Sequence, residues 1–169
     1  MSRKLRLKRG TTAQNAAYLG AEGEVTYDTQ AKSLVIHDGV TTGGIPVGGG
    51  LVECIPIACS DETTALTAGA AKVTFRMPYA FTLQAVRASL TTAQASGSIF
   101  TVDINDGISS VLSTKLTIDN TEKTSTTATT PAVISDTALA DDAEITIDID
   151  QIGDGTAKGL KVYLIGVKA

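Results

Sequence analysis

The sequence contains no tryptophan, one histidine and two cysteines among its 169 residues, and aromatic residues make up only 4% of it. A single histidine leaves no second imidazole for a histidine-based acid–base pair or metal site. No run approaches the roughly 20 apolar residues of a membrane-spanning helix, and no apolar segment of signal-peptide length follows the basic start. We therefore expect a protein that is synthesised in the cytoplasm and does not insert into a membrane.

The two cysteines, Cys54 and Cys59, lie five residues apart. Two thiols alone make neither a disulfide framework nor a zinc site. Because their spacing is odd, a regular strand would point them to opposite faces. We interpret them as unreactive free thiols in a reducing environment, and we expect no cofactor to be bound there.

Hydrophobic residues make up 43% of the chain, and glycine contributes 16 residues. The core must rest on Ile, Val, Leu and Ala, and the abundant β-branched residues favour strands over helices. The fold class is therefore predicted to be all-β. The glycine-rich segment 43–50 is the clearest boundary, and the Ile-Pro-Val between its glycines can pair as a short edge segment. We therefore predict an N-terminal module over 1–44, a Gly-rich linker over 45–50 and a second domain over 51–169.

The net charge of −4 is unevenly distributed. Residues 1–50 hold six Lys or Arg against four Asp or Glu, a balance of +2, so residues 51–169 carry −6. A basic start can dock on an acidic partner while the remainder keeps the protein soluble. The run Arg3–Arg9 is short, lacks interleaved aromatics and alternates with leucine as a strand does, so we expect no nucleic-acid partner.

The N-terminal module reads as three short strands and one helical turn. Thr11 or Thr12 can cap the turn, and Gly20 closes it. The expected elements are a strand over 5–9, the helical turn over 13–18, a strand over 24–27, a hairpin loop over 28–32 and a strand over 33–37. Such short elements cannot bury enough surface to be stable alone, so we expect the module to associate with copies of itself.

Three segments of this module, LKRGTTAQNAAY, AEGEVTYDT and KSLVIHDG, follow one another within residues 4–45. This ordered set resembles the N-terminal module of bacteriophage receptor-binding and tail-fibre proteins of the major-tropism-determinant type, with Tyr18 as the aromatic of its helical segment. The resemblance implies a small trimeric β-prism. The residues to which it assigns trimerisation and virion attachment are Arg6, Lys8, Arg9, Thr11, Thr12, Tyr18, Glu24, Tyr27 and Asp38.

Residues 51–169 alternate apolar and polar side chains almost throughout, with turn signals between about eight strands. This pattern predicts an antiparallel β-sandwich knob, jelly-roll-like in form. Pro56 indicates an edge strand, the phase slip at Ala85-Val86 indicates a bulge, and the apolar run 159–165 indicates a central strand. The Ser/Thr-rich segment 121–130 is interpreted as an exposed loop.

Few residues suit catalysis or metal binding. His37 is expected to be satisfied or solvent-facing and inert, and no nucleophile elbow or phosphate-binding loop is present. Asp148, Asp150 and Asp154 can supply oxygen ligands for calcium, but the EF-hand spacing is absent and a solvated acidic strand face explains them without any metal, so we expect no metal site. We therefore expect no enzymatic activity.

The resemblance, together with the short strands that need a partner and the absence of catalytic residues, implies a non-enzymatic phage structural protein on the virion surface: a homotrimeric spike or short fibre, serving as capsid decoration or as a head or tail fibre. Its partners would be copies of itself and phage capsid or tail proteins. The alternative is an adhesin that binds a host cell-surface carbohydrate or protein through the knob loops. The candidate loops for that binding are 60–70, 91–98, 105–110 and 121–132.

Overall fold

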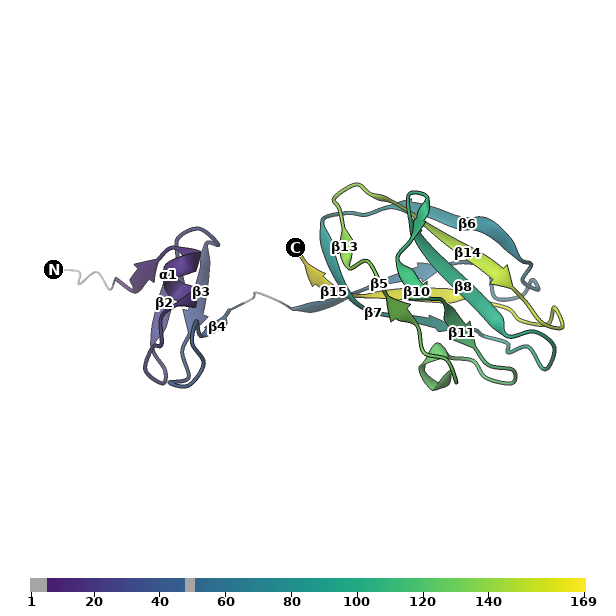
Figure 1. Cartoon of the computed structure of the whole chain (residues 1–169), viewed down its shortest axis with the longest axis horizontal. Coiled ribbons are helices and arrows are strands. Elements are labelled where there is room, and N and C mark those ends of the chain that lie inside the picture. The colour runs from purple at the N-terminus through teal and green to yellow at the C-terminus, as the bar shows by residue number, and fades with distance from the viewer. Residues whose placement is uncertain (1–5, 48–50) are drawn as a thin grey trace. The chain divides into compact units, whose positions relative to one another are not determined.

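The computed structural model describes residues 6–47 and 51–169. The chain divides into two compact units, Met1–Leu51 and Val52–Ala169, which we call the N-terminal unit and the body. Figure 1 labels the strands, which dominate both units. The predicted all-β class is confirmed, because the described residues contain one five-residue α-helix and one 3-10 turn besides strands.

The N-terminal unit is a four-stranded sheet with one helix. In sheet order the strands run β1-β2-β3-β4, with β1 parallel to β2 and the other neighbours antiparallel. The helix α1 connects the two parallel strands. The elements are β1 (Lys8–Gly10), α1 (Thr12–Ala16), β2 (Val25–Asp28), β3 (Ser33–Ile36) and β4 (Ile45–Pro46).

One local expectation for this unit needs correction. The helix begins after Thr11, whose hydroxyl accepts from the Gln14 backbone in a capping box, but it ends at Ala16 with Ala17 as its C-cap, rather than at Gly20. Ile45 and Pro46 pair with β3 as the short edge segment that was expected between the glycines. Residues 48–50, the glycine run expected as linker, lie outside the described residues.

The body consists of a four-stranded antiparallel sheet, a five-stranded antiparallel sheet and a short ribbon. One sheet has the order β13-β7-β15-β5, the other has the order β11-β8-β14-β6 with β9 paired to β8, and β10 pairs with β12 in the ribbon. The strands are β5 (Val52–Ala58), β6 (Gly69–Arg76), β7 (Phe81–Ser89), β8 (Phe100–Asp106), β9 (Ser109–Ser110), β10 (Leu112–Thr114), β11 (Leu116–Ile118), β12 (Val133–Ile134), β13 (Ala138–Leu139), β14 (Glu144–Gln151) and β15 (Lys161–Lys168), with the 3-10 turn η1 at Ser125–Thr127.

The strand pairing of the body is that of a jelly roll. Apart from the short β9, the two sheets contain eight strands: the first pairs with the last (β5 with β15), the second with the seventh (β6 with β14), the third with the sixth (β7 with β13) and the fourth with the fifth (β8 with β11). This nesting arises when one long hairpin of strands wraps around a core. The predicted antiparallel sandwich is therefore confirmed, jelly-roll form included.

Alternation along the strands explains how the body core forms. On β14 the three isoleucines at 145, 147 and 149 are buried, while Thr146 and Asp148 face the other side of the sheet. The side chains that face them come from the sheet β13-β7-β15-β5 and include Phe81, Leu83, Val162 and Leu164, all of which are buried. The core is thus a layer of mainly aliphatic side chains between two sheets, with Phe81 and Phe100 as its buried aromatics.

Three sequence expectations for the body are confirmed. The strand that contains Pro56 lies at the edge of its sheet, where a residue without a backbone N–H is tolerated. The register of β7 against β15 shifts between Ala85 and Leu83. The apolar C-terminal strand β15 lies between β7 and β5, in the interior of the sheet.

The loops of the body gather at two opposite ends. The pairing of β15 with β5 and β7 places Ala58 and Ser89 at the same end, opposite to Val52. The hairpin over 105–110 lies at the Val52 end, because Asp106 pairs with Ile145 and Gly107 bonds to Glu144. Within the described residues no helix is long and apolar enough to cross a membrane.

Candidate functional site

The N-terminal sheet has one covered face and one open face. On β3, Val35 is buried, whereas its neighbours Leu34 and Ile36 are exposed on the other side. The buried side chains of Thr26 and His37 lie on the same covered face as Val35, against α1 and its flanking loops. Because side chains alternate along a strand, the residues between them are directed to the open face.

The covered face is unusually polar. The Thr26 hydroxyl lies 3.1 Å from Asn15 Oδ1 and 3.1 Å from His37 Nε2, and all three residues are buried. Asn15 in turn donates from Nδ2 to the carbonyl oxygens of Gly10 and Thr11. If Thr26 donates to Asn15, then His37 carries its proton on Nε2 and donates to Thr26. This chain of bonds ties the helix to two strands.

Glycines allow the histidine ring to fit. A Cβ on Gly20 would lie 2.4 Å from His37 Cγ, and one on Gly44 would lie 2.8 Å from His37 Nδ1. That Nδ1 is the single buried side-chain nitrogen or oxygen without a hydrogen-bond partner in the part of the chain that the structure describes. The expectation of a satisfied or solvent-facing histidine is therefore wrong: His37 is 1% exposed and only half satisfied.

Lys8, Tyr18 and Glu24 form a cluster beside this core. The Lys8 ammonium lies 2.5 Å from the Tyr18 hydroxyl and 2.9 Å from Glu24 Oε1, and the Tyr18 hydroxyl donates to the same carboxylate. Hydrogen bonds from Lys8, Tyr18 and the Ala21 backbone lower the pKa of Glu24 to about 2, and Glu24 and Tyr18 raise the pKa of Lys8. The Tyr18 ring also packs edge-on against His37, with centroids 5.2 Å apart.

The threonines of the predicted motif hold the helix start. Thr11 caps α1, and the Thr12 hydroxyl donates to the buried carboxylate of Asp28. Asp28 also accepts the backbone N–H groups of Gln30 and Ala31, which together with Thr12 lower its pKa. These contacts explain why a Gly-Thr-Thr turn and a Tyr-Asp-Thr strand end occur together in the sequence.

Asp38 serves a separate turn. Its carboxylate accepts the backbone N–H groups of Val40 and Thr41 and the Thr41 hydroxyl. These bonds lower its pKa to about 2, the Thr41 backbone contributing most. Together with Gly39, which has φ +77°, the aspartate shapes the loop toward β4.

The open face carries an apolar row across the sheet. Tyr27 lies opposite Leu34, and Val25 lies opposite Ile36, which in turn lies opposite Ile45. Leu34, Ile36 and Ile45 are 39%, 45% and 57% exposed. We call Val25, Tyr27, Leu34, Ile36 and Ile45 the open face. Leu34, Ile36 and Ile45 are left only partly covered by the described residues.

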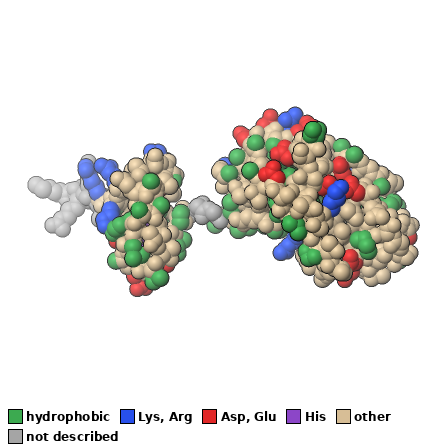
Figure 2. Space-filling view, viewed as in Figure 1, with side chains coloured by type: hydrophobic (Ala, Val, Ile, Leu, Met, Phe, Trp, Pro, Cys, Tyr) green, Lys and Arg blue, Asp and Glu red, His purple; other side chains and the backbone are tan. Residues whose placement is uncertain are grey.

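Basic residues border this face at β1. Arg9 lies opposite Tyr27, and Arg6, Leu7, Arg9 and Tyr27 line a hollow together. Figure 2 shows Lys and Arg side chains gathered on one part of the N-terminal unit. The structure therefore separates the nine predicted residues: Arg6, Arg9 and Tyr27 border or join the open face, whereas the other six stabilise the unit internally.

Sequence reasoning missed the aliphatic part of the open face. Leu34, Ile36 and Ile45 were not among the predicted site residues. The signal was present, because Leu34 and Ile36 are apolar at positions that alternate with Val35 and His37, so both faces of β3 carry apolar or aromatic groups. A strand that is apolar on both faces requires cover on both.

The three calcium candidates do not meet in one cluster. Asp148 accepts from the Ala71 backbone and Asn105, Asp150 pairs with Lys115, and Asp154 accepts the backbone N–H groups of Ala95 and Ser96. Among the described residues no group of three or more His, Cys, Asp or Glu side chains is placed to hold a metal ion. Each of the three carboxylates instead accepts hydrogen bonds or an ion pair that hold neighbouring strands and loops in place.

The two cysteines are free and differ in environment. Cys54 is exposed on the edge strand β5, and Cys59 is buried. Burial raises the pKa of the Cys59 thiol to about 11. A thiol that stays protonated is a poor nucleophile, so Cys59 has the character of a core residue.

The geometry of the N-terminal unit defines a class: a small β-module with a polar, hydrogen-bonded interior and an uncovered apolar sheet face. Residues 5–41 match the family described as the Major tropism determinant N-terminal domain. Residues 5–41 are thus similar to a domain of the major-tropism-determinant type, and the resemblance carried by the motifs is confirmed for this part of the chain.

A curated relative is the "Tail fiber receptor-binding protein" of Bordetella phage BPP-1, 47% identical over 47 residues. The alignment covers 28% of this chain and 12% of that relative, so the two proteins share only a small part of the relative's length. Solved structures of the Major Tropism Determinant U1 and P3c variants align over 63% of this chain and 31% of theirs, at 25% and 24% identity. Their TM-score of 0.25 is too low to support an argument about the whole chain.

Proposed function

We propose that this chain is a non-enzymatic phage virion protein: a homotrimeric surface spike or short fibre whose N-terminal unit associates and attaches, while the jelly-roll body projects. The observation that carries the proposal is the open apolar face, on a unit of the major-tropism-determinant type. The tail-fibre relative supports a place on the virion surface.

The balance of apolar surface in the N-terminal unit supports self-association. Val35 is its one fully buried hydrophobic side chain among the described residues. Its exposed large hydrophobics are Leu7, Leu19, Leu34, Ile36, Val40, Ile45, Val47 and Leu51. Since burying one such side chain fully contributes about 1.5–3 kcal/mol, a unit that buries one and exposes eight gains most of its stability from a partner.

A second copy of the same chain is the partner that this face fits. The row of Leu34, Ile36 and Ile45 is flat, aliphatic and free of charge, and such surfaces pack against their own kind in homo-oligomers. Three copies around one axis place three such faces together and close the assembly without a free face. Arg6 and Arg9 remain at the border, where they can contact acidic groups of capsid or tail proteins.

The environment of the single histidine supports a non-enzymatic role. Gly20 and Gly44 approach the His37 ring too closely for a substrate to reach it, and its exposed fraction is 1%. A general base must come within hydrogen-bond reach of its substrate. His37 is instead placed to order the interior of the unit.

Sedimentation equilibrium of the full chain tests the proposal. We expect a mass three times that of the 17.4 kDa chain, about 52 kDa. The variant Ile36→Glu places a charge in the open face and should dissociate the trimer, because an unpaired buried charge is costly. The matched control Ile108→Glu changes a fully exposed isoleucine of the body and should leave the mass unchanged. A single-chain mass at micromolar concentration contradicts the proposal.

A second function, host-receptor adhesion through the body, is favoured by a rigid loop cluster at the end opposite Val52. The buried Gln94 amide donates to the Ser98 carbonyl and Asn120, and its carbonyl accepts from Gly153. Asp154 holds the neighbouring loop through the backbone of Ala95 and Ser96. Ordered loops lose little entropy on binding, which suits receptor recognition.

Of the four loops expected to bind a receptor, 60–70 and 91–98 lie at this end, whereas the hairpin 105–110 lies at the other. The segment 121–132 is not a plain exposed loop: it contains η1, and Ser125 accepts the Ala88 backbone N–H. Binding of the fluorescently labelled trimer to host cells tests adhesion. Binding that is lost after substitution of exposed residues in 91–98 supports an adhesin. Absence of binding by the unchanged protein favours a role in capsid decoration.

A further inference from the structure

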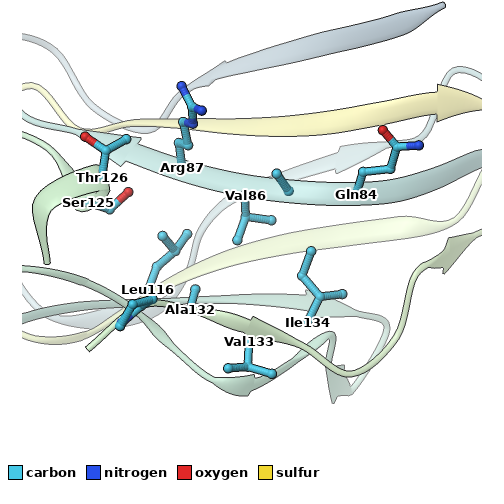
Figure 3. Close-up of a pocket in the computed structure, with 11 residues that line it drawn as sticks. Gln84, Val86, Arg87, Leu116, Ser125, Thr126, Ala132, Val133 and Ile134 are labelled. Carbon is cyan, nitrogen blue, oxygen red and sulfur yellow. The ribbon is translucent and has the colours of Figure 1, made fainter. Parts of the chain in front are cut away.

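The body contains a groove beside strand β7. The groove has a volume of about 530 Å³ and runs between β7 and the segment 131–134. Figure 3 shows Val86 of β7 directed toward Leu116, Ala132 and Ile134, which form an apolar floor, while Gln84 and Arg87 point away from that floor. Its rim near η1 carries the hydroxyls of Ser125 and Thr126.

One wall of the groove is a strand edge without a paired strand. On this side of β7, β13 pairs only with Phe81 and Thr82, and the Leu83 N–H donates to the Thr137 carbonyl. Pairing resumes where Ser125 accepts the Ala88 N–H. Between these points residues 84–87 have β15 on one side and no strand of the described chain on the other. Four residues of strand span about 13 Å.

The charge of the groove is opposite to that of the body. Residues 51–169 carry a net charge of −6, yet no carboxylate lines the groove. Its one charged side chain is Arg87, which is exposed and makes no ion pair with any described residue. An occupant with an acidic group at the rim and an apolar group on the floor complements this lining.

We propose that the groove binds an extended, acidic polypeptide segment of another protein. The segment adds as a short strand to residues 84–87 of β7 and continues the ladder that β13 begins. One apolar side chain enters the floor beside Val86, and one carboxylate pairs with Arg87. A carbohydrate fits less well, because no aromatic side chain lines the groove to stack on a sugar ring. The inference does not depend on the oligomeric state of the N-terminal unit.

A chemical-shift titration of the isotope-labelled full chain tests the proposal. The probe is the synthetic heptapeptide acetyl-Thr-Val-Thr-Val-Asp-Val-Thr-amide, which alternates apolar and polar side chains and carries one carboxylate. We expect saturable shifts confined to residues 84–87 and 131–134, with a Kd of about 0.1–1 mM, as a short and flexible ligand allows.

Two changes separate the charge contact from the backbone ladder. The variant Arg87→Glu should weaken binding about tenfold and should bind the peptide with Lys in place of Asp better than the unchanged protein does. The control Lys32→Glu makes the same charge change in the N-terminal unit and should leave the Kd unchanged. N-methylation of the peptide at the residues facing β7 should abolish binding, because it removes the donors of the ladder.

Three results overturn the proposal. The first is the absence of shifts at these residues up to about 5 mM peptide, which would mean an affinity weaker than the expected range. The others are a Kd that N-methylation of the peptide leaves unchanged and a Kd that Arg87→Glu leaves unchanged. Shifts at the same residues with an oligomer of N-acetylglucosamine, and none with the peptide, would assign the groove to carbohydrate instead.

Discussion

The buried hydroxyl of Thr26 allows the polar interior of the N-terminal unit to be tested by a change of few atoms. Thr26→Val keeps the shape of the side chain and removes the group that joins Asn15 to His37. Asn15 Oδ1 and His37 Nε2 then lose their shared partner, and His37 Nδ1 has none already. Each buried polar group left unsatisfied costs about 1–3 kcal/mol, so the unit should lose about 2–6 kcal/mol of stability.

Amide hydrogen exchange is the suitable assay, because a two-unit chain has no single free energy of unfolding. The His37 N–H, which donates to the Glu24 carbonyl, reports the N-terminal unit, and amides of β15 report the body. In Thr26→Val, exchange at His37 should rise at least about thirtyfold, the equivalent of 2 kcal/mol. Exchange in β15 should stay unchanged.

The control Thr26→Ser keeps the hydroxyl and removes one methyl group, so it should cost only about 1 kcal/mol. An exchange rate in Thr26→Val that equals the rate in Thr26→Ser would refute the reasoning. The hydrogen-bond chain would then contribute no more than packing does, and the polar interior would need another explanation.

Three further predictions concern acid, thiols and loop packing. Because the folded pKa of Glu24 is lowered to about 2 from 4.5, its stabilisation of the N-terminal unit is complete above pH 4.5 and is lost as the pH falls toward 2; Glu24→Gln should remove this part of the pH dependence of exchange. At pH 8, Ellman's reagent should react quickly with one thiol per chain, the exposed Cys54, and with Cys59 only on unfolding. Gly153→Ala puts a Cβ 2.2 Å from the Ser96 carbonyl oxygen and should lower the Tm of the body, a loss of about 1–3 kcal/mol.

Much of the fold follows from local patterns. The Gly-Thr-Thr turn, the Asp-Gly turn and the alternation in 144–150 predict elements that the structure contains, because turn chemistry and side-chain period act over a few residues. The pairing of β5 with β15, more than a hundred residues apart, could not be predicted, since alternation states which face is buried and not which strand lies beside it.

The site was predicted less completely than the fold. Family motifs pointed to Lys8, Tyr18 and Glu24, which hold the unit together internally. Leu34, Ile36 and Ile45 were missed because alternation shows that both faces of β3 are apolar but does not show which of the two faces the unit leaves uncovered. Burial of His37 was missed because its space is created by Gly20 and Gly44, which lie outside strand β3 and whose approach to the ring does not follow from the alternation along that strand.

Imaging of the intact virion by electron cryomicroscopy is the most direct test of the central claim. The account predicts a compact surface feature in which three copies meet through the open faces of their N-terminal units, with Leu34, Ile36 and Ile45 at the contact and three jelly-roll bodies projecting. Single copies on the virion, or copies joined only through their bodies while the open face stays in water, would contradict it.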